Sequence, residues 1–366
     1  LNTPGVYDEL ISFLGATNFR VLARGQRYGL HARGVAVDTA LPSGEEFPYF
    51  REVWIETPAA NASAIMMHAL LDSPSLTGAY HFKITPGVAS AVDISATLYA
   101  RKDIKKLGLA PMASMFFSGE GRPRAGEDYR PEVHNSDGLL IHNGAGEWLW
   151  RPLRNPSQLA VSDFVDRDVR GFGLMQRDRN FDHYQDLEAQ AEARPSYWVE
   201  PLGDWGEGAV ELVEIPTPDE TNDNVLSYWM PKQPLKKGGS TTFSYRLHAL
   251  NELTDETSHP GGKIVATYEE KLPPQPDSDI RPQRFIVDFS GGDLGYYLQN
   301  AGVVEAVVTT SSGKILASSV VPHARIGGFR ATFDIVPQAD TTADMRVYLS
   351  AGGKAITETW IYPWRN

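Results

Sequence analysis

The sequence predicts an all-β protein, and three observations support this fold class. The 33 glycines and 25 prolines are spread along all 366 residues, which is typical of short elements joined by many turns. Most apolar residues lie in short runs or alternate with polar residues, as they do in half-buried strands. Before residue 250, only two short stretches have the spacing of an amphipathic helix.

The first of these stretches lies near the start of the chain. Apolar residues follow Pro4 at helical spacing and stop at Gly15, so the pattern predicts a short helix there; they are Val6, Leu10, Ile11, Phe13 and Leu14. The second predicted helix covers residues 186–193. Strands are predicted at residues 65–71, 79–84, 92–99, 148–150, 173–176, 209–215 and 225–229.

The length and the change of composition after residue 250 predict two domains. Residues 1–250 form a large β-sandwich in this interpretation, and the polar residues 251–261 form a linker. Residues 262–366 form a small immunoglobulin-like β-sandwich, because regular hairpins follow one another there. Their strands are expected at residues 305–310, 315–321, 329–335, 345–349 and 355–362.

Charge and composition exclude several classes of partner. The 34 Lys and Arg against 46 Asp and Glu give a formal charge of −12, which disfavours nucleic acid and an anionic membrane surface. There are no cysteines, and no phosphate-binding, H-E-x-x-H or G-x-S-x-G motif occurs, so we expect no cofactor and no metal. His134 and His142 form either a shared metal site or an ordinary hydrogen-bonded pair.

Aromatic residues are concentrated in one part of the chain. Such rings stack on the apolar faces of sugars, or else they fill the core of a large sandwich. Five of the eight tryptophans lie there, namely Trp148, Trp150, Trp198, Trp205 and Trp229.

The same region contains an acidic loop between two predicted strands. Asp219, Glu220 and Asp223 lie within five positions, and crowded carboxylates raise one another's pKa, as a general acid requires. A solvated acidic turn is the alternative. Aromatic platforms and paired carboxylates together favour carbohydrate chemistry.

Several long stretches also resemble a known family. They include AVDTALPSGEEFP at 36–48, GEWLWRPL at 146–153, and VELVEIPT at 210–217 running into DETNDN at 219–224, with shorter ones at 13–16, 25–30 and 70–74. They resemble the periplasmic glucan biosynthesis proteins of the G and D type, which act in making osmoregulated periplasmic β-glucans.

The resemblance implies a mutarotase-like large β-sandwich followed by an immunoglobulin-like domain. It also implies a periplasmic location, with the signal peptide and the first strands of the large sandwich absent from this chain. The implied partner is β-1,2-glucan, with a membrane glucan synthase and a homodimer as further options.

Family members with an assigned activity resemble inverting β-1,2-glucan glycosidases. The resemblance places the general acid at Asp223 and the Glu of the same motif at Glu220. The base is expected in a stretch that reads H-D-S-N-G in the family and H-N-S-D-G at residues 134–138 here. Because the amide of Asn135 cannot accept a proton, Asp137 is expected to take that role, or else the enzyme transfers the glycosyl unit to a sugar hydroxyl.

A non-catalytic glucan-binding partner of a membrane synthase is the alternative function. Either function needs residues that hold the polymer. The expected ones are Trp148, Trp150, Arg151, Arg177, Arg179 and Tyr228.

Overall fold

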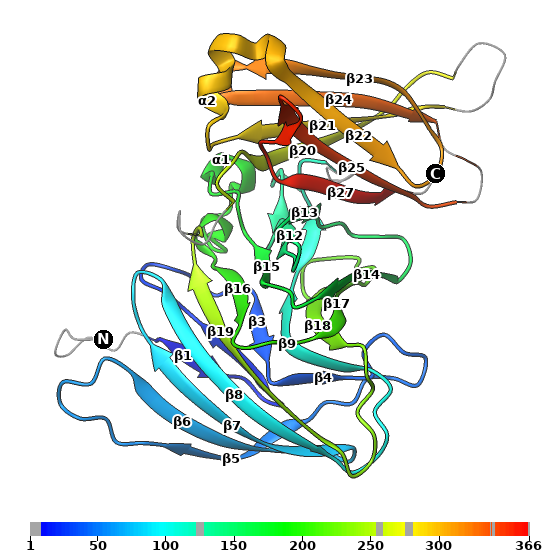
Figure 1. Ribbon diagram of the computed structural model, residues 1–366. Coiled ribbons are helices and arrows are strands. Elements are labelled where there is room, and N and C mark those ends of the chain that lie inside the picture. Colours follow the sequence, from blue (N-terminus) through cyan, green and yellow to red (C-terminus); the bar gives the residue numbers. More distant parts are fainter. Residues whose placement is uncertain are drawn as a thin grey trace. The chain divides into compact units, whose positions relative to one another are not determined.

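The computed structural model describes residues 9–121, 128–253, 259–274, 281–336, 338 and 341–364 (Figure 1). Strands dominate these ranges, which confirms the predicted all-β class. The α-helices, α1 (Phe181–Tyr184) and α2 (Leu294–Tyr297), have only four residues each. Within the described ranges no helix is long and apolar enough to span a membrane.

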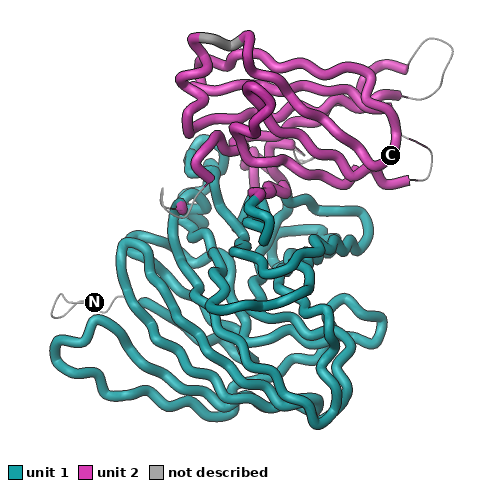
Figure 2. The backbone as a smooth tube through the Cα atoms, in the orientation of Figure 1, with its two compact units in different colours: residues 1–117, 133–146, 153–252 teal, residues 118–132, 147–152, 253–366 magenta. Residues whose placement is uncertain are grey.

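The chain forms two compact units (Figure 2). Unit 1 contains residues 1–117, 133–146 and 153–252, and unit 2 contains residues 118–132, 147–152 and 253–366. The change after residue 252 falls within the stretch expected to be a linker. The expected continuous domain of residues 1–250 differs from this division, because residues 118–121, 128–132 and 147–152 belong to unit 2.

One sheet of unit 1 has the order β1-β2-β3-β9-β18-β17-β14, with β4 paired to β9 (Figure 1). Its strands are β1 (Ile11–Phe13), β2 (Asn18–Val21), β3 (His31–Arg33), β4 (Val35–Val37), β9 (Leu107–Ser114), β14 (Ala160–Arg167), β17 (Glu207–Glu214) and β18 (Val225–Pro231). A separate short ladder pairs β10 (Phe116–Ser118) with β11 (Val133–His134).

The other sheet of unit 1 runs in the order β12-β15-β16-β19-β8-β7-β6-β5. Its strands are β5 (Tyr49–Ile55), β6 (Ile65–Asp72), β7 (Leu76–Thr85), β8 (Ser90–Ala100), β12 (Gly138–His142), β15 (Gly171–Met175), β16 (Ser196–Pro201) and β19 (Ser240–Leu250). Alternate residues of β7 and β8 are buried, which is the period-two pattern that the sequence shows.

The two sheets of unit 1 pack face to face through aromatic side chains. Phe19 of β2 lies 5.7 Å from Phe82 of β7 between ring centroids. The Tyr197 hydroxyl of β16 donates to the Val21 carbonyl of β2 at 2.9 Å. Trp229 is fully buried in this unit, 6.2 Å from Trp205. The aromatic residues of this region therefore build a sandwich core.

The helix predicted at the N-terminus is wrong over its described part, and Val6 lies outside the described residues. Residues 11–13 form strand β1, which pairs antiparallel with β2. Phe13 stacks on Phe19 at 5.6 Å, and Gly15 takes a left-handed φ of +88° in the turn that follows. Pairing with β2 therefore outweighs the helical spacing. The helix expected at 186–193 shrinks to a 3₁₀ turn, η1 (Ala191–Ala193), after α1.

The strands of unit 2 form two sets, one of five strands and one of four. One has the order β22-β25-β27-β13, with β26 beside β25, and the other has the order β20-β21-β24-β23. The 3₁₀ turns are η2 (Leu298–Val303) and η3 (Ala324–Ile326). The strands are β13 (Trp148–Pro152), β20 (Lys263–Lys271), β21 (Gln283–Ser290), β22 (Val304–Thr310), β23 (Lys314–His323), β24 (Gly328–Val336), β25 (Ala343–Ala351), β26 (Lys354–Ala355) and β27 (Thr359–Trp364).

Candidate functional site

The acidic loop that contains Asp223 joins β17 to β18, and its base is closed by Asn224. The buried Asn224 side chain accepts a hydrogen bond from the N–H of Phe116 at 2.8 Å. It donates to the carbonyl oxygens of Phe116 and Ile215, both at 3.0 Å. The N–H of Ile215 donates to the Asn224 carbonyl at 2.8 Å. These bonds fix the position of Asp223 beside the end of β9.

The Asp223 carboxylate contacts a histidine that the sequence does not single out. Its Oδ2 lies 3.1 Å from Nδ1 of His31, the first residue of β3. The His31 side chain is 7% exposed and that of Asp223 is 27% exposed. One oxygen of the carboxylate therefore contacts a buried imidazole, while part of the group stays open to solvent and to a ligand.

The pKa of Asp223 is lower than the ordinary value, opposite to the expectation from crowded carboxylates. Burial alone would raise the pKa of this carboxyl. The hydrogen bond from His31 and the positive charges of His31, Arg20 and Arg33 together outweigh burial. At neutral pH the free protein therefore holds Asp223 as a carboxylate.

Two of these cations come from neighbouring strands, since Arg20 lies in β2 and Arg33 in β3. Arg33 also pairs with Glu45 at 3.0 Å, and Thr39 donates to the same Glu45 oxygen at 2.8 Å. No local motif in the sequence marks His31, Arg20 or Arg33. Only the pairing of β3 with β9, which places His31 opposite Ala113, brings them to the acidic loop.

The stretch at residues 134–138 reaches the same end of β9. The N–H of Asn135 donates to the Met115 carbonyl at 2.8 Å, and the hydroxyl groups of Ser136 and Ser114 lie 2.8 Å apart. The Asn135 amide also donates to the Gly29 carbonyl at 3.3 Å, two residues before His31. The structure thus gathers Asp223, His31 and the 134–138 stretch around residues 113–116.

Asn135 is buried, and both the nitrogen and the oxygen of its amide form hydrogen bonds within the protein. The amide nitrogen binds Gly29, as described, and the amide oxygen accepts a hydrogen bond from the Arg194 guanidinium. An amide does not take up a proton at neutral pH. Asn135 therefore positions the chain between Gly29 and Arg194.

The surroundings of the Asp137 carboxyl raise its pKa. Its Oδ2 accepts hydrogen bonds from the backbone N–H groups of Arg177 and Asp178, at 2.8 and 2.9 Å. Its Oδ1 is buried and has no hydrogen-bond partner among the residues that the structure describes. Burial raises the pKa of Asp137, and the nearby charges of His134 and Arg177 offset this only in part.

Arg177 and Arg179 were expected to hold a ligand, and the structure gives both a role near Asp137. Arg177 contributes its backbone N–H to Asp137. The Arg179 guanidinium donates to the carbonyl oxygens of Glu192 and Asn251, both at 3.0 Å. Arg179 therefore connects three parts of unit 1, and its guanidinium is engaged by the protein.

Trp148, Trp150 and Arg151 lie in β13, which belongs to unit 2, whereas Asp223 belongs to unit 1. The tryptophans are 6% and 4% exposed, and Arg151 is fully buried with its guanidinium 5.1 Å from the ring centroid of Tyr362. Trp150 pairs in register with Trp360 of β27. These side chains fill the core of unit 2 and leave no open face for a sugar.

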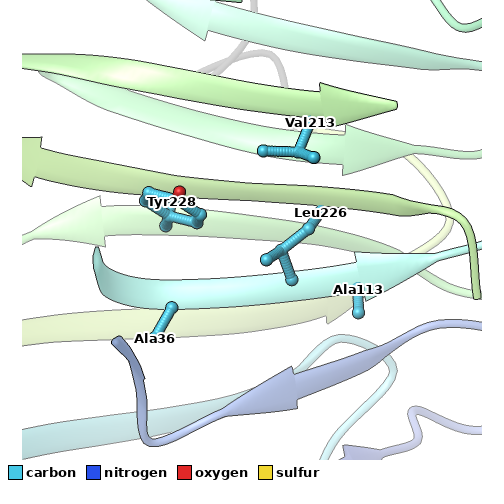
Figure 3. Close-up of a cluster of buried hydrophobic side chains, with 5 residues drawn as sticks. All are labelled: Ala36, Ala113, Val213, Leu226 and Tyr228. Atoms are coloured by element: carbon cyan, nitrogen blue, oxygen red, sulfur yellow. The ribbon is translucent and has the colours of Figure 1, made fainter. Parts of the chain in front are cut away.

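Tyr228 is likewise a core residue. It is fully buried in a cluster with Ala36, Ala113, Val213 and Leu226 (Figure 3). Its hydroxyl donates to the buried Glu211 carboxylate, which Lys106 also contacts at 2.9 Å. Burial and the bond to Glu211 raise the pKa of Tyr228. The ring therefore offers no stacking surface.

The remaining candidates are Glu220 and the His134 and His142 pair. Glu220 lies partly buried in the acidic loop. His134 is buried, with its Nδ1 2.9 Å from Gln176 Oε1 and its ring stacked on Phe116 at 5.5 Å. Its Nδ1 is thus engaged by an amide, as expected for a hydrogen-bonded core histidine.

Known proteins resemble this chain over nearly its whole length. The family described as "Periplasmic glucan biosynthesis protein, MdoG" matches residues 1–364. A probable glucans biosynthesis protein D of Shewanella oneidensis is 46% identical over 97% of this chain and 66% of its own length. The glucans biosynthesis protein G of Rhodopseudomonas palustris is 46% identical over 100% of this chain and 70% of its own. That of Ralstonia nicotianae is 47% identical over 99% and 72%.

The chain thus spans about two thirds of the length of the first of these relatives. Among solved structures, an α-galactosidase from Geobacillus stearothermophilus aligns with 59% of this chain and 30% of its own, at 12% identity and a TM-score of 0.33. That likeness is too slight to support any inference. Because the family matches almost the whole chain and these relatives are about 46% identical to it, the chain belongs to the periplasmic glucan biosynthesis protein family MdoG.

Proposed function

We propose that this chain acts on β-1,2-glucan as an inverting glycosidase or transglycosylase in periplasmic glucan biosynthesis, with Asp223 as the proton donor. The family and its relatives support the glucan, and the resemblance of the acidic loop supports the linkage and the reaction. The observation that carries the proposal is the Asp223 carboxyl, fixed by its loop, paired with His31 and still 27% exposed.

A proton donor must be protonated when the glycosidic bond breaks, whereas the pKa of free Asp223 is low. Burial is already the largest influence on this carboxyl, and it acts to raise the pKa. A bound glucan removes water from the exposed part of the carboxyl and strengthens that influence. Substrate binding therefore moves Asp223 toward the protonated form that donates to the leaving oxygen.

Inversion also needs a base that activates a water molecule on the opposite face of the sugar. Asp137 is the proposed base, since its Oδ1 has a lone pair that no described residue uses and burial raises its pKa. Asn135 is excluded from this role, because both ends of its amide are bound. Where a sugar hydroxyl replaces the water, the same base yields transfer or ring closure.

Linear β-1,2-glucan and product analysis test the proposal. Shorter oligosaccharides with one new reducing end per bond broken indicate hydrolysis. Longer or cyclic products without new reducing ends indicate transfer. The catalytic proposal is contradicted if the polymer stays unchanged at protein concentrations at which a gel shows that the protein binds it.

The low pKa of Asp223 in the free protein specifically favours a second function, a non-catalytic glucan-binding partner of a membrane synthase. A permanent carboxylate binds sugar hydroxyls as a hydrogen-bond acceptor but donates no proton. In that case Asp223→Asn keeps glucan binding and glucan production, whereas in the catalytic case it keeps binding alone.

A further inference from the structure

The side chain of Arg20 lies near the Asp223 carboxyl, although the two residues are far apart in the sequence. In the antiparallel ladder between β2 and β3, Phe19 lies opposite Ala32. Arg20 is the next residue of β2 and therefore comes level with His31, which contacts the Asp223 carboxylate at 3.1 Å. The charge of Arg20 also helps to lower the pKa of Asp223, as expected for two neighbouring groups of opposite charge.

The guanidinium of Arg20 forms no hydrogen bond or ion pair with any residue that the structure describes, Asp223 included. Its Nε is buried without an acceptor. Its Cζ lies 5.7 Å from the ring centroid of Tyr28, and this cation–π contact uses none of the N–H groups. Because Arg20 is only partly buried, a ligand can reach its side chain.

Arg33 is the other arginine whose charge acts on Asp223, and it is engaged differently. Its guanidinium pairs with Glu45 at 3.0 Å, and its Cζ lies 5.7 Å from the ring centroid of Phe47. Of these two arginines, only Arg20 has no carboxylate partner among the described residues. Its donors therefore stay available for a molecule that binds at the partly exposed Asp223 carboxyl.

A guanidinium and a carboxylate that are close but not bonded to each other favour one kind of ligand. An anion is repelled by Asp223 and a cation by Arg20. A neutral hydroxyl group fits both, because it accepts a hydrogen bond from the guanidinium and donates one to the carboxylate. Each ring of a glucan carries several such hydroxyl groups.

We propose that Arg20 binds the glucan at Asp223, with its N–H groups donating to hydroxyl groups of the sugar that lies against this carboxyl. The inference rests on the proposed function and adds to it a residue that holds the substrate. The planar fork of donors in an arginine can bind two oxygens of one sugar at once, which also fixes the direction in which the ring faces Asp223.

Affinity electrophoresis with linear β-1,2-glucan tests the role of Arg20. Arg20→Gln removes both the charge and the fork of donors, whereas Arg20→Lys keeps the charge and removes the fork. Each variant should raise the dissociation constant for the glucan about tenfold or more, because hydrogen bonds from a charged group are lost. The matched control is Arg24→Gln, since Arg24 is exposed and lies just beyond β2; it should bind the glucan as the wild type does.

Several results would overturn the inference. They are wild-type affinity in Arg20→Lys, which would leave only a role for the charge, wild-type affinity in Arg20→Gln, and no glucan binding by the wild type. Competition of inorganic phosphate with the glucan that disappears in Arg20→Gln would indicate an anion site instead and would also overturn it.

Binding is measured separately from product formation, so the two proposals can fail independently. A wild type that binds the glucan without changing it contradicts the reaction alone, and the comparison of the Arg20 variants still decides their role in binding. Far-UV circular dichroism shows whether each variant is folded, and either Arg20 variant suffices for the comparison.

Discussion

Replacing Asp223 with asparagine tests the proposed reaction most directly. The amide is nearly isosteric with the carboxyl, and its oxygen still accepts the hydrogen bond from His31 Nδ1, 3.1 Å away in the wild type. The loop should therefore keep its form, because Asn224 closes its base independently. The amide has no acidic proton, so only proton donation is lost.

General acid catalysis contributes ~10²–10⁴-fold to a rate, which corresponds to about 3–5 kcal/mol of transition-state stabilisation. We expect Asp223→Asn to lower kcat on linear β-1,2-glucan by this factor while the dissociation constant for the glucan changes by less than about threefold. A reducing-end assay gives the rate, and affinity electrophoresis in glucan-containing gels gives the binding.

The control for this experiment lies in the same loop. Asp219 is a carboxylate whose visible role is to accept hydrogen bonds from Thr221, and an asparagine can accept them equally well. Asp219→Asn should retain wild-type turnover. A kcat for Asp223→Asn within a few-fold of the wild type would refute the reasoning and exclude this carboxyl as the donor.

Three further predictions follow from the same contacts. His31→Gln removes the bond and charge that lower the pKa of Asp223, so that pKa rises and the alkaline limb of the kcat/KM profile moves to higher pH; an unmoved limb would contradict the pairing. Asp137→Asn should abolish most hydrolysis. Folding raises the pKa of Asp137, so the free energy of unfolding of the wild type should fall relative to that of this variant as the pH rises above about 4. Urea unfolding measures this difference, and a difference that does not change with pH would contradict the raised pKa. Tyr228→Phe should lower the free energy of unfolding by about 1–3 kcal/mol, because the buried Glu211 loses a hydrogen-bond donor, and it should leave glucan binding intact. Weaker glucan binding by this variant would instead support a role of Tyr228 in holding the sugar.

Local patterns predicted most of the fold. Alternation in residues 79–84 and 92–99 corresponds to β7 and β8, which are buried at every second position. The N-terminal segment failed because apolar residues at positions 10, 11, 13 and 14 fit a helix and a short strand equally well. Its partner β2 decides the outcome, and that pairing is tertiary information.

The candidate site was predicted less completely, for two physical reasons. A local motif can locate the acidic loop, but His31 reaches Asp223 only through the neighbouring strands β3, β9 and β18. An aromatic residue in a strand is equally compatible with a core and with a binding face. Trp150 and Tyr228 belong to the core, and only their burial distinguishes the two roles.

The exchange of amide and carboxylate between positions 135 and 137 has a physical consequence. At position 135 an acid would meet the Arg194 guanidinium, which lowers a carboxyl pKa and makes a weak base. At position 137 one carboxylate oxygen instead meets two backbone N–H groups, the other is buried with no hydrogen-bond partner among the described residues, and the pKa is raised by burial. A base works best when its pKa lies near the working pH. If the proposed reaction is correct, this arrangement favours Asp137 over position 135 as the base, while Asn135 contacts Gly29 and Arg194.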